Sequence, residues 1–222
     1  MTLNNFTSRI FTSLILLVFL YFIFINKFLM IFSLVIVLII SSIEFNNLIL
    51  KIKNLKKKYI TSLFYRVTFF IYLIIFVFLI CYSFFENIFY LKLVIFYCTL
   101  ISIASDIGGY VVGNIFKGKK LTSISPNKTI SGSIGSIFFS LLLIPIFNEF
   151  FINISIILFS LYTVAISIIS QAGDLFISFL KRLAKVKDTG NLLPGHGGLL
   201  DRIDGLLFAI PIGVFIINYF LQ

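Results

Sequence analysis

The residues best suited to chemistry lie in one stretch, from Ser178 to Asp204. It reads SFLKRLAKVKDTGNLLPGHGGLLDRID and holds three of the five aspartates and the only histidine. Long apolar runs precede and follow it. Carboxylates, cations and glycine-rich turns in one place suit reactions of phosphates, because charge neutralisation and positioning supply most of the catalysis in such reactions.

Three aspartates are candidate ligands of a divalent metal. Asp201 and Asp204 stand three residues apart at the start of the last apolar span, so a helix would place them on one face. Asp174 opens a polar stripe upstream, which continues at offsets of four, seven and eight residues with Ser178, Lys181 and Arg182. Carboxylate oxygens favour Mg²⁺. The structural alternatives are that one aspartate caps the helix and that another pairs with the arginine between them.

The loop 183–200 connects these acidic positions and is rich in glycine. It contains Gly190, Gly195, Gly197 and Gly198, together with Pro194. Such glycines let backbone amides approach an anion closely. His196 has the chemistry to donate to a phosphate or to act as an acid or base, and the alternative is that it only fixes the loop.

A second group of polar residues lies upstream. Asp106 stands near the end of an apolar run, where an ionisable group is a functional candidate by default. Gly109 and Gly113, four residues apart, indicate close helix packing, which is the structural alternative for this motif. Farther on, Ser125 and Thr129 are candidate helix caps, and Pro126 suits a first helical turn. A helix N-terminus with Lys128 beside it could hold a phosphate; the structural alternative is that serine- and glycine-rich helix starts are common in membrane bundles.

The composition predicts an all-α, polytopic integral membrane protein. The chain has 222 residues, of which 60% are hydrophobic and 12% are charged, and its mean hydropathy is +1.13. No soluble domain of this size could bury so much apolar surface. We expect about seven spans, near residues 10–26, 28–43, 67–85, 88–113, 130–148, 151–182 and 203–221. The first is expected to be a retained helix and not a cleaved signal peptide.

Two spans and two cysteines need separate comment. The run 151–182 would be about 48 Å long as a helix, against a bilayer core of about 30 Å. It therefore either continues into the cytoplasm or breaks near Gly173. Cys81 and Cys98 both fall inside apolar runs and are expected to be buried fillers, with neither a disulfide nor a metal between them.

The cations predict the orientation of the chain. Sixteen of the eighteen lie near the N-terminus or in three loops that would share one side of the membrane, so we expect the N-terminus in the cytoplasm and the C-terminus outside. The net charge of +10 is thus explained by topology and anionic lipid or phosphate ligands, and no nucleic-acid partner is expected. The basic segment 51–66 is predicted to be a loop that meets lipid headgroups, with a substrate role as the alternative.

Three motifs resemble those of the phosphatidate cytidylyltransferase (CDP-diacylglycerol synthase) family. The main one covers the 27 positions 178–204, and SQAGDL leads into it at residue 170. SDIGGYVVG from residue 105 and ISPNKT from residue 124 resemble two further family motifs. The resemblance covers about residues 100–222, which we expect to be the catalytic transmembrane region. Residues 1–99 would supply N-terminal helices and the basic cytoplasmic loop.

The resemblance implies that CTP and phosphatidate react to give CDP-diacylglycerol and pyrophosphate. By similarity, Mg²⁺, with a potassium ion nearby, would be held by Asp174, Asp201 and Asp204. The groups acting on the phosphates would be Asp174, Lys181, Arg182, Lys187, Asp188, His196 and Arg202. The nucleotide side would comprise Asp106, Ser125, Lys128 and Thr129. The family also implies a homodimer in the cell inner (cytoplasmic) membrane, with its active site facing the cytoplasm.

The chain departs from the family pattern on the nucleotide side. The family usually has a second lysine where Asn127 stands, a glutamate where Ser131 stands and an arginine where Asn114 stands. The chain is also short for the family, so one or two N-terminal helices of longer relatives are expected to be absent.

Two other functions compete with this interpretation. A small transporter with intramembrane acids would place them near the bilayer midplane and would show an inverted repeat, whereas these acids cluster at predicted cytoplasmic ends and no repeat is visible. A related enzyme could transfer a nucleotide or phosphate to another lipid acceptor. Apolar surface does not distinguish such acceptors, so only the motif over residues 178–204 argues against this alternative.

Overall fold

The computed structural model describes residues 26–52, 58–86, 88–152, 154–191 and 197–220. The predicted span 10–26 lies almost entirely outside these residues. The described chain forms the helices α2 (Lys27–Lys51), α4 (Tyr59–Phe85), α5 (Phe89–Phe116), α6 (Ile130–Leu141), α7 (Ile144–Phe147), α8 (Ile156–Leu183) and α9 (Leu200–Phe220), with one 3₁₀ turn, η1 (Asn148–Phe151). Over these residues no β-strand is present, and an isolated bridge joins Lys120 and Thr129. The all-α prediction is confirmed.

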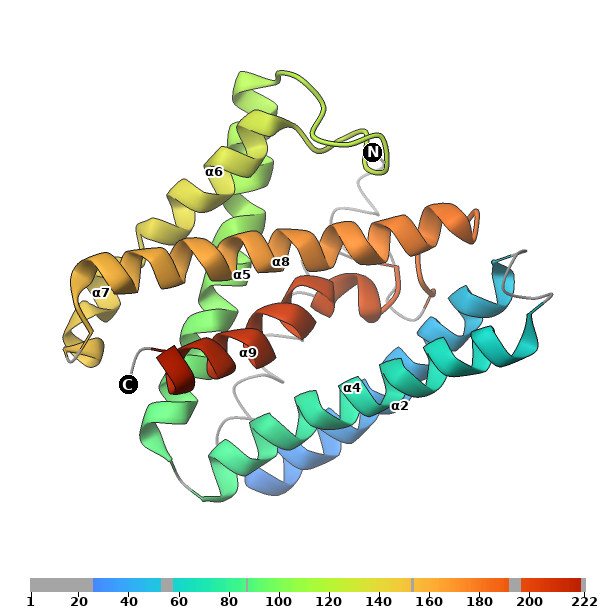
Figure 1. The fold of residues 1–222 in the computed structure, drawn as a ribbon, viewed down its shortest axis with the longest axis horizontal. Helices are drawn as coiled ribbons and strands as arrows, with labels where there is room; N and C mark the ends of the chain where they lie inside the picture. The colour runs from blue at the N-terminus through green and yellow to red at the C-terminus, as the bar shows by residue number, and fades with distance from the viewer. Residues whose placement is uncertain (1–25, 53–57, 87, 153, 192–196, 221–222) are drawn as a thin grey trace, which may run out of the picture. The chain divides into compact units, whose positions relative to one another are not determined.

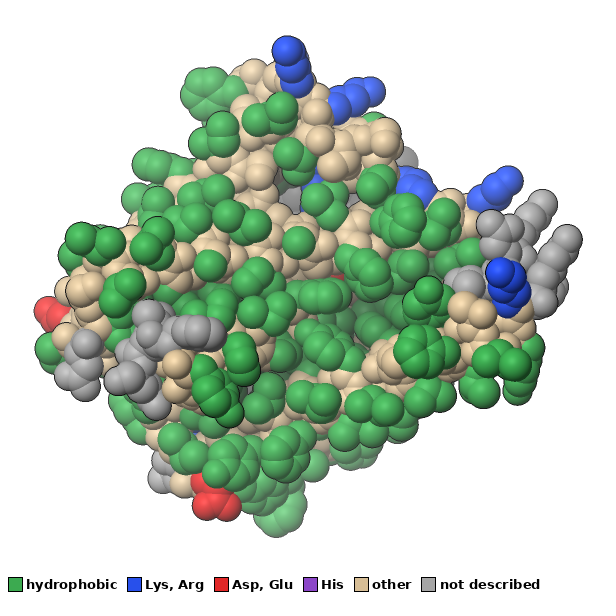
Figure 2. All heavy atoms as spheres, in the orientation of Figure 1, with side chains coloured by type: hydrophobic (Ala, Val, Ile, Leu, Met, Phe, Trp, Pro, Cys, Tyr) green, Lys and Arg blue, Asp and Glu red, His purple; other side chains and the backbone are tan. Residues whose placement is uncertain are grey.

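Five helical segments have the length and composition to cross a membrane. They are α2, α4, α5, the stretch Ile130–Phe151 and α8. Helix α9 covers the predicted span 203–221 but is not one of these five. Hydrophobic side chains cover much of the face drawn in Figure 2. Such a surface needs lipid around it, so the chain is a membrane protein.

The segment between the second and third predicted spans is more helical than predicted. Helix α2 continues past residue 43 to Lys51, and α4 already begins at Tyr59, so only residues 52–58 separate them. The continuation of α2 buries Phe45, Leu48 and Ile49. The predicted loop 51–66 therefore begins within one residue of the observed end of α2, but its predicted end was wrong, because residues 59–66 are already helical. Apolar residues at helical spacing outweighed the charges between them.

The spans after residue 130 also differ in detail from the prediction. Helix α6 ends at Leu141, and α7 starts again with Pro145 in its first turn, because proline has no amide hydrogen to donate back into the preceding turn. Helix α8 begins at Ile156 and runs through Gly173 to Leu183 without a break. Of the two predictions for the long span, the break near Gly173 is wrong.

The helices group into two compact units, each described here by itself. Unit 1 comprises residues 1–84 and 180–202, and unit 2 comprises residues 85–179 and 203–222. In unit 1, α2 and α4 run side by side (Figure 1), with the rings of Phe45 and Phe69 stacked at a centroid distance of 3.7 Å. Arg66 Nη1 donates to Asn46 Oδ1 at 3.1 Å between the same two helices.

Unit 2 has a core of aromatic rings and small polar groups. Tyr97, Phe151 and Phe159 are fully buried and in ring contact. The hydroxyls of Tyr97 and Thr163 lie 2.7 Å apart, so this buried polar pair is satisfied. Cys98 is buried and Cys81 half-buried, and both are free thiols, as predicted.

Helices α5 and α6 of unit 2 approach each other through glycine. A Cβ added at Gly109 would lie 2.7 Å from Ser136 Oγ, and one added at Gly132 would lie 2.8 Å from the backbone oxygen of Gly109. Ser136 Oγ also donates to the backbone oxygen of Ser105 across the same contact, at 2.7 Å. The Gly109 and Gly113 motif is thus a packing motif, which was its structural alternative.

Candidate functional site

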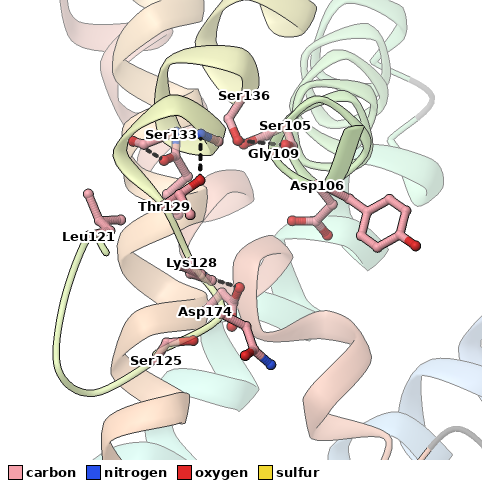
Figure 3. A pocket seen from close by; sticks show the side chains of 14 residues that line it. Ser105, Asp106, Gly109, Leu121, Ser125, Lys128, Thr129, Ser133, Ser136 and Asp174 are labelled. Carbon is pink, nitrogen blue, oxygen red and sulfur yellow. Dashed lines mark hydrogen bonds and ion pairs between the residues drawn. The ribbon is translucent and has the colours of Figure 1, made fainter. Parts of the chain in front are cut away.

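A polar cavity lies between α5, the 117–129 loop, α6 and α8, all within unit 2. Its volume is about 360 Å³, which falls in the usual range of small-molecule sites. Asp106, Lys128 and Asp174 are the charged residues of its lining, and hydroxyl groups and glycines supply much of the rest. Figure 3 shows Asp106 on one side of this space and the Lys128–Asp174 pair on another. The four predicted nucleotide-side residues, Asp106, Ser125, Lys128 and Thr129, all line the cavity together with Asp174.

Lys128 and Asp174 form an ion pair inside this cavity. The Nζ atom of Lys128 contacts Asp174 Oδ2, and Ser178 Oγ donates to Asp174 Oδ1 at 3.3 Å. Both charged side chains are about a quarter exposed, so the pair is open to solvent and to a ligand. One turn before Asp174, Gln171 Oε1 accepts a hydrogen bond from Ser133 at 2.6 Å. The start of the polar stripe predicted on α8 therefore lines the cavity, whereas Lys181, farther along the stripe, contacts Asp201 in unit 1.

The N-terminus of α6 forms another part of the wall. Thr129 is its N-cap, and its hydroxyl accepts from Gly132 N at 3.1 Å. The amides of Ile130 and Ser133 donate to the backbone oxygens of Lys119 and Thr129. Most first-turn amides therefore already have protein partners, and phosphate binding here would depend chiefly on Lys128 and nearby hydroxyls.

The segment before α6 differs from the prediction. The helix begins at Ile130, so Pro126 lies in a turn and not in the first helical turn. Ser125 does not cap the helix; its carbonyl accepts from Lys128 N at 3.1 Å and closes that turn. At a position where the chain departs from the family, Ser131 donates its hydroxyl to the Lys117 backbone oxygen. The serine there serves the loop structure.

Helices α8 and α9 meet in unit 2 close to two of the predicted metal ligands. A Cβ added at Gly173, the residue before Asp174, would lie 2.7 Å from the backbone oxygen of Asp204. Asp204 is buried, and its Oδ1 accepts from Gly205 N at 2.8 Å. Among the described residues, no three acidic, histidine or cysteine side chains are grouped so as to hold a metal ion.

In unit 1 the part of the 178–204 motif between α8 and α9, called the signature loop below, contacts Asp201. Lys181 Nζ donates to Asp201 Oδ1 at 2.6 Å, and Asp201 Oδ2 accepts from the amide of Thr189 at 2.8 Å and from that of Gly198 at 3.2 Å. Burial raises the pKa of the Asp201 carboxyl, but the hydrogen bonds from Lys181 and Thr189 lower it by more, so that pKa lies below its usual value. The carboxylate is therefore ionised and joins the end of α8, the loop and the start of α9.

The remaining predicted site residues belong to the same stretch of the chain. Arg182, Lys187, Asp188 and Arg202 have exposed side chains. Gly197 adopts a left-handed φ of +81°, and a Cβ there would lie 3.3 Å from both Asp188 Cβ and Asp201 Oδ2. His196 lies outside the described residues, as do Pro194 and Gly195. The roles of all these side chains stay predictions.

One functional candidate was missed entirely. Glu44, in α2, is 5% exposed, and its carboxylate accepts hydrogen bonds from the signature loop of unit 1. It was overlooked because the predicted span ended at residue 43, which left the glutamate at the edge of an apolar run. An acid embedded in such a run was the available signal, since ionisable residues inside membrane helices are seldom incidental.

Fold and site together define a polytopic helical membrane protein with lysine–carboxylate pairs, one of them in a polar cavity. The family model described as the Cytidylyltransferase family matches residues 2–220, and the chain belongs to that family. A protein of Staphylococcus haemolyticus named phosphatidate cytidylyltransferase is 46% identical over 121 residues, which are 53% of this chain and 46% of that protein. One of the same name from Bacillus subtilis is 44% identical over 128 residues, 57% and 48% of the two chains. The chain thus spans about half the length of the curated relatives it matches.

Proposed function

We propose that this protein is a phosphatidate cytidylyltransferase, which converts CTP and phosphatidate into CDP-diacylglycerol and pyrophosphate. The observation that carries the proposal is the cavity of unit 2, where Lys128, Asp106 and Asp174 line one space. Membership of the Cytidylyltransferase family and the names of the relatives supply the nucleotide and the lipid acceptor. The apolar helices fit an acceptor that stays in the membrane.

The reaction requires no protein nucleophile. An oxygen of the lipid phosphate forms a bond to the α-phosphorus of CTP, and the bond between that phosphorus and the oxygen bridging to the β-phosphate breaks. Pyrophosphate leaves with that oxygen. The work of the protein is to bring two anions together, and the lysines serve this purpose: Lys128 in unit 2, and Lys181 at the end of α8 in unit 1.

We further propose that Mg²⁺ is held by Asp174, Asp201 and Asp204, with a potassium ion nearby. The donor set is made only of carboxylate oxygens, which suits a hard cation. The close approach of Gly173 to Asp204 supports Asp174 and Asp204 as neighbours, and helix spacing puts Asp201 one turn before Asp204. A bound divalent ion would neutralise phosphate charge and fix the phosphates.

The cellular setting belongs to the same proposal. The seven-span topology, the cytoplasmic N-terminus and an active site that faces the cytoplasm rest on the distribution of lysine and arginine. We also propose an inner-membrane location, which the bacterial relatives support, and a homodimer, which the resemblance of the sequence motifs implies.

The decisive experiment is transfer of label from CTP to lipid by the purified protein in detergent. With Mg²⁺ and phosphatidate present we expect a labelled CDP-lipid and one pyrophosphate for each turnover, and we expect chelation by EDTA to stop both. Replacing phosphatidate by a polyprenyl phosphate tests the alternative acceptor. Folded protein that makes no CDP-lipid from phosphatidate would contradict the proposal, and product with the polyprenyl acceptor alone would redirect it.

A further inference from the structure

Glu44 is a buried carboxylate that binds backbone and hydroxyl donors of the signature loop. Its Oε2 accepts from Leu200 N at 2.8 Å and from Thr189 Oγ1 at 2.9 Å, and its Oε1 accepts from Leu199 N at 3.0 Å. All these groups belong to unit 1. Leu200 is the first residue of α9, so a side chain of α2 provides acceptors for amides at the start of a helix more than 150 residues later in the chain.

On either side of residues 192–196, the backbone of the loop packs closely against this carboxylate. A Cβ added at Gly190 would lie 2.5 Å from Glu44 Oε1, and one added at Gly198 would lie 2.6 Å from Glu44 Oε2 and 2.7 Å from Gly190 N. The glycines of the signature predicted that backbone would approach an anion closely. For Gly190 and Gly198, the anion they approach within unit 1 is the Glu44 side chain.

Thr189 connects Glu44 to the Asp201 network. Its hydroxyl lies 2.9 Å from Glu44 Oε2 and 3.0 Å from Asp201 Oδ2, and a hydroxyl has only one hydrogen to donate. Since the Thr189 amide already donates to Asp201, the hydroxyl hydrogen is the one left for Glu44. A continuous chain of contacts then runs from Glu44 through Thr189 and Asp201 to Lys181.

We infer that Glu44 is a positioning residue for the transfer reaction: it fixes the signature loop and the start of α9, so that Asp201 and Lys181 keep the geometry needed to act on phosphates. This inference rests on the proposed function for its catalytic consequence. The anchoring itself stands on the contacts within unit 1. It also gives the N-terminal helix α2, which contains none of the predicted site residues, a specific part in the reaction.

The chemistry of the side chain makes Glu44→Gln a sharp test. The glutamine side chain has one acceptor oxygen where the carboxylate has two. Its NH₂ group, a donor, would therefore face another donor, either the Leu199 amide or the Leu200 amide and Thr189 hydroxyl. We expect kcat to fall about tenfold or more, and the KM for CTP to change less than about twofold, because the cavity of unit 2 keeps its residues. Glu149→Gln, at an exposed site, is the matched control and should leave both constants unchanged.

Hydrogen exchange supplies a readout independent of activity. In detergent, the amides of residues 197–203 should exchange about tenfold faster in Glu44→Gln than in the wild type, while those of α5 and α6 stay unchanged. Thr189→Val should produce part of the same increase in exchange. The losses of kcat in Thr189→Val and Glu44→Gln should not add in the double variant, because both substitutions break one chain of contacts. Thr189→Ser, which keeps the hydroxyl, should restore activity.

The outcomes separate the two proposals. If the wild-type protein transfers no cytidylyl group, the proposed function fails, while the exchange measurement still decides whether Glu44 anchors the loop. If the wild type is active and Glu44→Gln shows unchanged kcat or unchanged exchange over 197–203, the positioning role is wrong. Should Glu44→Gln not fold, Thr189→Val and Thr189→Ser give the same decision.

Discussion

At the scale of single residues, the Lys128–Asp174 ion pair lies in the cavity of unit 2, with each side chain about a quarter exposed. Each charged group is partly open to solvent. A ligand can therefore take the place of either partner in the ion pair at little cost in desolvation. A phosphate would draw Lys128 toward it and leave Asp174 available to a cation. Under the proposed function, the ion pair would be the arrangement of these two side chains before the substrates bind.

Asp174→Asn tests the acidic half of this pair. The amide keeps the size of the side chain and the acceptor for Ser178, but it removes the charge that a divalent ion needs. We expect kcat to fall by about 10² or more, comparable with the loss of one preorganised electrostatic group, while the protein still inserts and elutes as the wild type does. The labelled-CTP assay measures this, and wild-type turnover would remove Asp174 from the metal site.

Lys128→Met tests the basic half. The cavity would lose its lysine next to Asp174, so we expect the KM for CTP to rise about tenfold or more, with a smaller effect on the KM for phosphatidate. Lys120→Met is the matched control, because Lys120 is an exposed lysine of the same loop and does not line the cavity. Equal effects of the two substitutions would show that only the net charge of the loop matters.

Residue types and spacing predicted the members of the cavity well, but not the contacts within unit 1. Asp106, Lys128 and Asp174 stand in motifs, and α5, the 117–129 loop and α8 bring them to one cavity. Glu44 belongs to none of these motifs. Its partner amides at Leu199 and Leu200 are backbone groups, which no side-chain pattern can reveal.

At the scale of elements, the cavity depends on how closely α5 and α6 pack. A Cβ at Gly135 would lie 2.8 Å from the backbone oxygen of Gly108 and still closer to the Val112 side chain. Neither backbone can move without displacing Asp106 or Thr129, which sit on these helices beside the cavity. Small residues here are therefore a requirement of the site as well as of the fold.

Gly135→Val should separate the two helices. Overpacking of this kind costs about 1–3 kcal/mol, so we expect a lower unfolding temperature in detergent and a raised KM for CTP. Ile134→Ala, one position earlier on the exposed side of α6, is the control and should leave the unfolding temperature nearly unchanged. An unaltered temperature in Gly135→Val would mean that the helices do not pack as described.

Element boundaries were the least predictable feature, for physical reasons that differ from place to place. Helix α2 extends beyond its predicted end because buried apolar residues continue after Glu44. The start of α6 at Ile130 agrees with the predicted span 130–148, and Thr129, one of the two candidate caps, is the N-cap, whereas Pro126 lies in a turn. Helical period and hydropathy fix where a span exists, whereas single caps and turns fix where it stops.

At the scale of the whole molecule, the compact units do not follow the order of the chain. Unit 1 takes its helices from residues before 85 and its signature loop from residues 180–202. The N-terminal part of the chain contains none of the family motifs named above. It is nevertheless packed against the segment that holds most of the predicted site residues. Sequence alone divides the chain at about residue 100, because the motifs begin there, and contacts made across long sequence separations are invisible to that division.

Topology is the property of the whole molecule that the charges predict most directly. The stretch Ile130–Phe151 is a single candidate span of 22 residues, with Lys120 before it and Glu149 near its end. Such a stretch is about 33 Å long when helical, which is enough to cross the bilayer core. Lysine and arginine side chains gather at the α5–α6 end of unit 2, and an acidic side chain lies by α7 (Figure 2). The two positions should therefore face opposite sides of the membrane.

Single cysteines at these positions measure the orientation. With a maleimide that does not cross membranes, we expect Glu149→Cys to be labelled in intact cells and Lys120→Cys only after permeabilisation, because lysine-rich loops stay in the cytoplasm. The unmodified chain, whose Cys98 is buried and Cys81 half-buried, measures the background. Labelling of Lys120→Cys alone in intact cells would reverse the orientation and would put the cavity, with its CTP, on the side of the membrane that lacks nucleotides.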